Sequence, residues 1–255
     1  MKDKILKHYQ IIPFRQNILA RRAFVESLTY YVLKNYDFRN RQICDIGCSA
    51  SFIGNFIKLN YPEYRYLGLD FNLRAIEIAH SRGIKVIAGD NMSLPLLNEC
   101  SDFTISEGVI HHAQDPYKCF QELIRITKKG GYISLLVYNK NSYYFYLFKL
   151  CKPLRVIYQS CGNLNRCIFL KLVFSLYYYS FLFFISKILQ IKEKIPLREI
   201  MNNFHDQILN PRVYFFKENE IKNFCKNRLN LIKFKKKYMG KSLLFLFNKV
   251  SDKSC

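Results

Sequence analysis

Three aspartates stand where a sheet would present them to a nucleoside. Asp45, Asp70 and Asp90 each follow a short strand-like apolar run, and the small-residue turn GCSAS at 47–51 comes just after the first. An acidic residue about 20 residues beyond such a turn is placed to hold the two hydroxyls of a ribose. Each aspartate alone is typical of a helix cap or a turn. Their joint placement predicts a cofactor site.

The turn adds a second kind of chemistry, because it leads from a strand into a new helix across residues 41–54. Free backbone N–H groups at a helix start bind a carboxylate or a phosphate. The turn lacks the pattern G-x-G-x-x-G, so a pyrophosphate-binding, nicotinamide-dependent oxidoreductase is disfavoured.

Alternating elements would bring these residues together. Strand-like runs are predicted at 42–46, 64–70, 85–88, 103–106 and 132–138, and helices at 18–36, from 52, at 73–82 and at 117–127. Such alternation predicts a parallel sheet with crossover helices on both faces.

The end of the chain breaks this rhythm. A helix at 218–226 precedes two strand-like runs, 231–238 and 242–248, which are joined closely enough to form a hairpin. We therefore expect an α/β, Rossmann-like, seven-stranded sheet: five parallel strands plus a C-terminal hairpin with an antiparallel strand. The expected core is 1–138 with 212–250, including an N-terminal helix within 15–36. An aromatic helical insertion or lid at 139–211 follows strand five, with helical stretches expected at 143–158 and 167–191, and 251–255 form a tail.

Five motifs in this order resemble the class I S-adenosylmethionine-dependent methyltransferases of type 11. They are CDIGC at 44–48, YLGLD ending at Asp70, AGDNMSLPL at 88–96, DFTISEGVIHH at 102–112 and RITKKGGY at 125–132. The resemblance covers about 36–138 and includes the closing hairpin. It implies a methyltransferase with S-adenosylmethionine (SAM) as cofactor. Cys119 follows His111 and His112 closely enough to suggest a metal site, but no fourth ligand stands at a usable spacing, so no metal is expected.

The resemblance also implies a role for each matched position. Asp45, Gly47 and Cys48, with Ser49 in the same turn, would take the methionine end of SAM, and the backbone around Glu107 would face its amino acid moiety. Asp70 would hold the ribose, with Phe71 beside the adenine. Asp90 would accept from the adenine amino group, and Asn91 and Met92 would line that pocket.

Two departures from the family pattern bear on activity. Ser49 and Ser51 stand where glycine is usual, and Lys129 where proline is usual. A side chain in the turn is expected to weaken cofactor affinity or shift its pose. A non-catalytic relative that uses the fold as a binding platform is therefore an alternative.

His111 and His112, after the fourth strand, are the candidate catalytic residues. A base is needed only if the acceptor keeps its proton, and either imidazole would serve beside the methyl group. The alternative is a pair of loop histidines satisfied by backbone groups.

The insertion carries a charge-free run, LVFSLYYYSFLFFIS at 172–186. As a helix it would reach about 22 Å, short of the roughly 30 Å of a bilayer core. It is expected to be a lid over an apolar acceptor, or to lie in a membrane interface. In the second case a set of basic residues would face the headgroups: Lys149, Lys152, Arg155, Lys171 and Lys187.

The charge of +21, from 40 Lys plus Arg against 19 Asp plus Glu, favours anionic partners. We predict a small, hydrophobic or lipid-like acceptor at an anionic membrane surface. An RNA methyltransferase is the alternative, because phosphates suit the charge and tyrosines stack on bases, but the basic residues are dispersed. Nine scattered cysteines without a CxxC pair, and an N-terminus without a signal-peptide core, indicate the cytoplasm.

Overall fold

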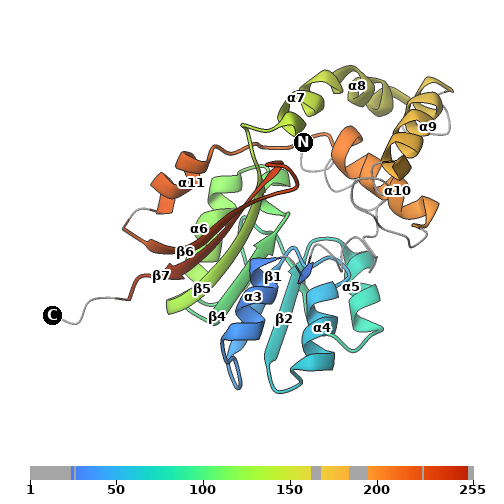
Figure 1. Ribbon diagram of the computed structural model, residues 1–255. Coiled ribbons are helices and arrows are strands. Elements are labelled where there is room, and N and C mark those ends of the chain that lie inside the picture. Colours follow the sequence, from blue (N-terminus) through green and yellow to red (C-terminus); the bar gives the residue numbers. More distant parts are fainter. Residues whose placement is uncertain (1–23, 26, 162–167, 184–194, 226, 252–255) are drawn as a thin grey trace.

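The computed structural model describes residues 24–25, 27–161, 168–183, 195–225 and 227–251. Its centre is one seven-stranded sheet with the order β3-β2-β1-β4-β5-β7-β6 (Figure 1). The strands are β1 Gln42–Ile46, β2 Arg65–Asp70, β3 Val86–Ala88, β4 Ser101–Glu107, β5 Thr127–Tyr138, β6 Leu229–Lys237 and β7 Ser242–Lys249. The first five are parallel, and β7 runs antiparallel to both β5 and β6. The predicted fold class is confirmed.

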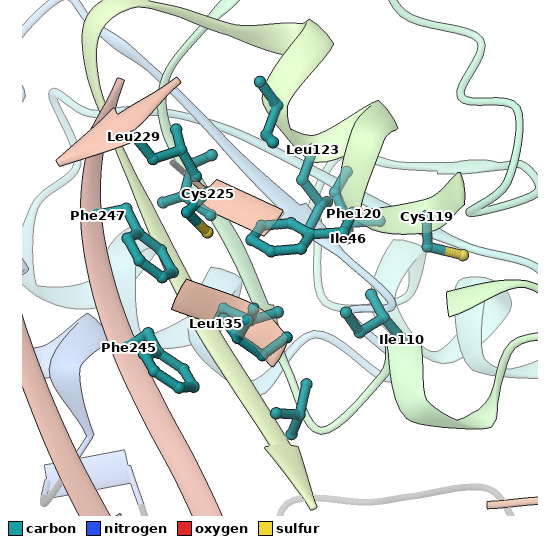
Figure 2. Packing of buried hydrophobic residues seen from close by; sticks show 14 of the residues in the cluster. Ile46, Ile110, Cys119, Phe120, Leu123, Leu135, Cys225, Leu229, Phe245 and Phe247 are labelled. Atoms are coloured by element: carbon teal, nitrogen blue, oxygen red, sulfur yellow. The ribbon is translucent and has the colours of Figure 1, made fainter. Parts of the chain in front are cut away.

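Alternating side chains build a core on each face of the sheet. On β7, Phe245 and Phe247 face α6 (Pro116–Ile126) and α11 (Glu218–Cys225), as Figure 2 shows. Leu244 and Leu246 point the other way, toward α3 (Leu28–Asn35) and α4 (Phe52–Asn60). Each buried side chain of this size stabilises the fold by about 1.5–3 kcal/mol. A strand that is apolar on both faces suits a position inside the sheet.

Two element boundaries differ from the sequence prediction. The helix expected within 15–36 falls partly outside the described residues, and α3 begins only after Ser27, whose Oγ accepts from the N–H of Tyr30 at 2.9 Å. Strand β5 begins at Thr127 instead of 132, because Thr127 already pairs with Ser101 across a register shift. The Gly130–Gly131 pair therefore lies within the strand.

The insertion is helical. It lies beyond the carboxyl end of β5, which is the strand that α7 follows (Figure 1). Its elements are α7 Tyr143–Leu150, α8 Lys152–Cys161, α9 Ile168–Phe183, α10 Leu197–Phe204 and the π-turn η4 His205–Leu209. The single helix expected over 143–158 is broken at Cys151, and Pro153, which has no N–H, stands in the first turn of α8. The expected helix over 167–191 is seen to Phe183, and 184–191 lie outside the described residues.

The insertion has its own packing. Leu170 of α9 is fully buried against Phe204, Ile208 and Leu209. α10 and η4, which supply these residues, were not predicted from the sequence. Within the described ranges, no helix is long and apolar enough to cross a membrane.

Strand order also fixes where a ligand can bind. The chain moves outward from β1 to β3 and then returns to β4 on the other side of β1. In open parallel sheets, ligands bind beyond the carboxyl ends of the strands at such a reversal.

Candidate functional site

A cavity of about 590 Å³ opens at this reversal, within the size range of small-molecule sites. Residues after β1, β2, β3 and β4 form most of its wall. The lining comprises Gly47, Ser49, Asp70, Phe71, Asn72, Ala88, Gly89, Asp90, Asn91, Met92, Glu107, Gly108, Val109, His112, Ala113, Gln114, Tyr138 and Asp206.

The turn after β1 requires glycine at its first position. Gly47 has φ +79°, and a Cβ there would lie 2.3 Å from Cγ1 of Val109. Its N–H and that of Cys48 donate to the carbonyl of Leu69, at 2.7 and 3.1 Å, which fixes the turn against β2. Only glycine combines this φ with so close an approach.

Asp70 is held rigidly at the end of β2. The N–H of Ser49 donates to Oδ2 at 2.7 Å, and the N–H of Asn72 donates to Oδ1 at 2.8 Å. Burial raises the pKa of Asp70, although these backbone donors oppose the shift. The carboxylate is thus oriented on the cavity wall, with lone pairs left for the hydroxyls of a ligand.

Two further acids lie near Asp70. Oδ2 of Asp45 accepts from the hydroxyl of Tyr66 at 2.8 Å, and burial raises the pKa of Asp45 to about 7. Oε1 of Glu107 accepts from the hydroxyls of Thr29 and Ser134, both at 2.6 Å. The three acids make this end of the cavity negative in a strongly basic chain, which suits a cationic ligand.

Not all predicted residues of the first turn reach the cavity. Asp45 and Cys48 are both buried and lie behind the lining. Cys48 packs in a cluster with Ile76 and Val86 instead. They support the turn, while Gly47 and Ser49 face the ligand space.

The opposite end of the cavity suits a nucleobase. Phe71, Asp90, Asn91 and Met92 line it, and Oδ1 of Asp90 accepts from the N–H of Met92 at 3.0 Å. Oδ1 of Asn91 is buried and has no hydrogen-bond partner in the described part of the chain. A buried acceptor without a donor is costly, so this atom is able to accept from a ligand N–H.

The two predicted histidines differ in their access to the cavity. His112 lines the cavity, whereas His111 is fully buried behind it, with its ring centroid 4.0 Å from that of Tyr138. Burial lowers the pKa of both imidazoles, so both are neutral at pH 7. Nε2 of His112 lies 3.8 Å from Oδ1 of Asp206.

Several lining residues were missed by the sequence analysis, among them Val109, Gln114, Tyr138 and Asp206. Asp206 belongs to η4, in the insertion, and no motif marks it. Asn72 could have been found, since an Asn directly before a helical run is a common N-cap.

The sheet order, the antiparallel seventh strand and a cavity at the reversal define the class I, SAM-dependent methyltransferase fold. A SAM-dependent methyltransferase from Thermotoga maritima shares it, with a TM-score of 0.53 at 16% identity over 98% of this chain and 100% of that chain. Residues 44–135 match the family model described as a methyltransferase domain. This part of the chain is a type 11 methyltransferase domain.

Curated relatives are similar to part of the chain. The chain is 36% identical over 99 residues to the Bos taurus protein named "Probable tRNA methyltransferase 9B", which covers 38% of this chain and 21% of that protein. It is 30% identical over 95 residues to malonyl-[acyl-carrier protein] O-methyltransferase from Hahella chejuensis, covering 36% and 34%. The aligned part thus spans a fifth to a third of the length of these two relatives.

The residues present fit SAM, the cofactor of this class. The negative acids match its ammonium and sulfonium charges, and the orphaned Oδ1 of Asn91 matches an adenine amino group. Gly47 lines the cavity beside these acids, where the backbone of the turn is open to the methionine end.

Proposed function

We propose that this protein is an active SAM-dependent methyltransferase. The observation that carries the proposal is the convergence of Gly47, Asp70, Asp90 and Asn91 on one cavity with acids at one end and an unpaired acceptor at the other. Asp70 would hold the ribose diol. Asp90 and Asn91 would accept from the adenine amino group, between Phe71 and Met92.

The chemistry divides between cofactor and chain. When bound, SAM supplies a methyl group that is already electrophilic. The chain's part is to hold the acceptor atom in line and to exclude water, a contribution of up to about 7–11 kcal/mol. The backbone around Gly47 and Glu107 would orient the amino acid moiety.

The acceptor in this proposal is a small, apolar or lipid-like molecule, taken in the cytoplasm at an anionic membrane surface. Support comes from a stripe on α9, defined as Phe169, Leu172, Leu176, Tyr179 and Phe183. These residues recur at helical intervals and are 52–71% exposed. Exposed apolar stripes of this kind mark interaction sites.

Basic residues near this stripe favour an anionic surface. Lys149, Lys152 and Lys171 are exposed, as expected. The expectation for Arg155 was wrong: it is 8% exposed, stacks on the ring of Phe148 at 3.7 Å and donates to a backbone carbonyl. Lys187 lies outside the described residues.

RNA is the second candidate acceptor. The relative named a tRNA methyltransferase and the net charge of +21 favour it. Salt-sensitive binding of transfer RNA in a gel-shift assay, without binding to lipid vesicles, would support RNA over the lipid-like acceptor.

Calorimetry with SAM tests the proposal. Wild-type protein should bind SAM with measurable heat. Asp70→Asn should weaken binding tenfold or more, since a hydrogen bond to a charged group contributes about 1.5–3 kcal/mol. Glu77→Gln, an exposed charge change on α5 (Leu73–His80), is the control and should bind as wild type. Absence of binding by wild type would favour the non-catalytic alternative.

A further inference from the structure

One polar side chain reaches the cavity from the insertion. Asp206 lies in η4, and it is the insertion's contribution to the lining among the described residues. η4 is anchored at two carbonyls: the hydroxyl of Tyr144 donates to Gln207 O at 2.8 Å, and a guanidinium N–H of Arg155 donates to Ile208 O at 3.4 Å. Ile208 is also buried, so the position of Asp206 is structurally determined.

The neighbouring imidazole presents an N–H to this carboxylate. Oδ1 of Asn210 accepts from the N–H of Arg212 at 3.1 Å, which leaves Nδ2 of Asn210 facing Nδ1 of His112, also at 3.1 Å. Nδ1 also lies 3.4 Å from the carbonyl oxygen of Arg212. The amide contact is the shorter of the two, and two N–H donors cannot face each other, so the amide donates to Nδ1. The proton of neutral His112 is then on Nε2, the atom 3.8 Å from Oδ1 of Asp206.

The titratable groups near Asp206 differ in whether they face the cavity. His111 and His112 are neutral because burial lowers the pKa of each. Lys241, in the turn before β7, is buried, and its Nζ lies over the rings of Tyr144 and Tyr138, at 4.3 and 5.1 Å. Burial lowers the pKa of Lys241 to about 8, so it is mostly charged at pH 7, but it does not line the cavity. With Nε2 of His112 protonated, the carboxylate oxygens of Asp206 are hydrogen-bond acceptors on the cavity wall.

We propose that Asp206, with His112 and Tyr138, forms an acceptor subsite for a protic nucleophile, a hydroxyl or an amine, and that it rejects carboxylates. This deepens the proposed function and rests on it. Like-charge repulsion disfavours a carboxylate beside Asp206, and a carboxylate acceptor would need no base. The subsite thus separates this chain from a relative named as a malonyl O-methyltransferase.

The proton balance of the reaction is simple. The acceptor's lone pair forms the new bond to carbon while the sulfur–carbon bond pair stays on sulfur, which leaves S-adenosylhomocysteine. The acceptor's O–H or N–H proton passes to a carboxylate oxygen of Asp206 and from there to solvent. Nε2–H of His112 orients that carboxylate, and no oxidant or further reactant is needed.

A matched series of head groups tests the subsite without turnover. The probes are decylamine, 4-hexylphenol and decanoic acid, titrated by calorimetry below their micelle concentrations into protein saturated with S-adenosylhomocysteine. Wild type should bind the amine and the phenol at least tenfold more tightly than the acid. Asp206→Asn should remove this preference, because it loses a charge-assisted hydrogen bond. Glu77→Gln, remote from the cavity, should keep it.

Turnover provides the second readout. With radiolabelled SAM, wild type should methylate the phenol or the amine, and Asp206→Asn should be slower by about 10²–10⁴, the usual contribution of a general base. SAM affinity and thermal midpoint should be unchanged in this variant, which shows that it folds. Preference for decanoic acid, or an unchanged preference in Asp206→Asn, would overturn the inference. Loss of SAM binding by wild type would instead overturn the proposed function.

Discussion

Asp45, Asp70 and Glu107 are three carboxyl groups held close together in a chain of charge +21. Burial and mutual repulsion raise the pKa of Asp45, which means that part of the population is protonated at neutral pH. A cationic ligand would reverse that balance, because it favours the charged form. The three carboxyl groups are therefore an unfavourable charge arrangement, which a bound SAM cation would make more favourable.

A pH dependence follows from Asp45. Its pKa is about 7 in the fold and 3.8 as its ordinary value, so its stabilising effect is full below pH 3.8 and is lost as pH rises through 7. We expect the ligand-free wild type to lose more thermal stability than Asp45→Asn between pH 6 and pH 8. Melting curves of both proteins across this range check it. Equal slopes would contradict the burial of a titrating Asp45.

SAM affinity should show the opposite trend with pH. Because binding of a cation favours the carboxylate form, wild-type affinity should fall as pH drops below 7, and Asp45→Asn should show a weaker dependence. Calorimetry with SAM at pH 6 and pH 8 measures the affinity of wild type and of Asp45→Asn.

At the scale of elements, the turn between β1 and α4 shows how the two serines are accommodated where the family usually has glycine. Ser49 and Ser51 have φ of 50° and 54°, the left-handed region where glycine is favoured. The fold therefore keeps the conformation that glycine would adopt, at a cost of about 1–2 kcal/mol per residue. The conformation of Ser51 is offset by a hydrogen bond: its Oγ donates to the hydroxyl oxygen of Tyr66 at 2.7 Å, and that hydroxyl donates to Asp45.

The two serines should therefore respond differently to glycine. Ser49→Gly relieves strain and keeps the N–H that donates to Asp70, so we expect a gain in stability of up to about 1 kcal/mol. Ser51→Gly loses a buried hydrogen bond of about 1 kcal/mol, so we expect no gain or a loss. Urea unfolding of both variants decides. A gain in Ser51→Gly equal to that in Ser49→Gly would rule out a supporting role for this hydroxyl.

At the scale of the whole molecule, the insertion contributes two features that bear on the acceptor. Its π-turn brings Asp206 to the cavity, and its α9 stripe offers exposed apolar surface away from the packed face of the helix. An amphiphile with a protic head group would use both. The cavity would take the head group while the tail stays with the lipid.

Vesicle binding tests this division. Wild type should cosediment with vesicles containing phosphatidylglycerol and less with neutral vesicles. Leu172→Glu with Leu176→Glu should reduce binding tenfold or more, since each exposed leucine that enters an apolar phase contributes about 1.5–3 kcal/mol. Leu59→Glu with Leu97→Glu changes leucines of similar exposure on the core and is the control. Equal binding by both double variants would exclude α9 as the membrane contact.

The sequence by itself determined the sheet, its order of elements and several lining residues of the cavity end that we propose for the cofactor. Those features depend on apolar periodicity and on acids that follow strand ends, which are local patterns. Asp90 and Glu107 stand at or just after strand ends, and both line the cavity. Asp45 and Cys48 matched the motif equally well, yet only packing showed that they lie behind the lining.

Tertiary structure alone decided the end of the cavity that we propose for the acceptor. Asp206 meets His112 because α10 and η4 fold back across the cavity, held by Tyr144, and no local pattern encodes such a return. The same packing places His111 behind the cavity lining and buries Arg155. Contacts between residues far apart in the chain depend on how helices pack, and a single sequence read along its length does not specify them.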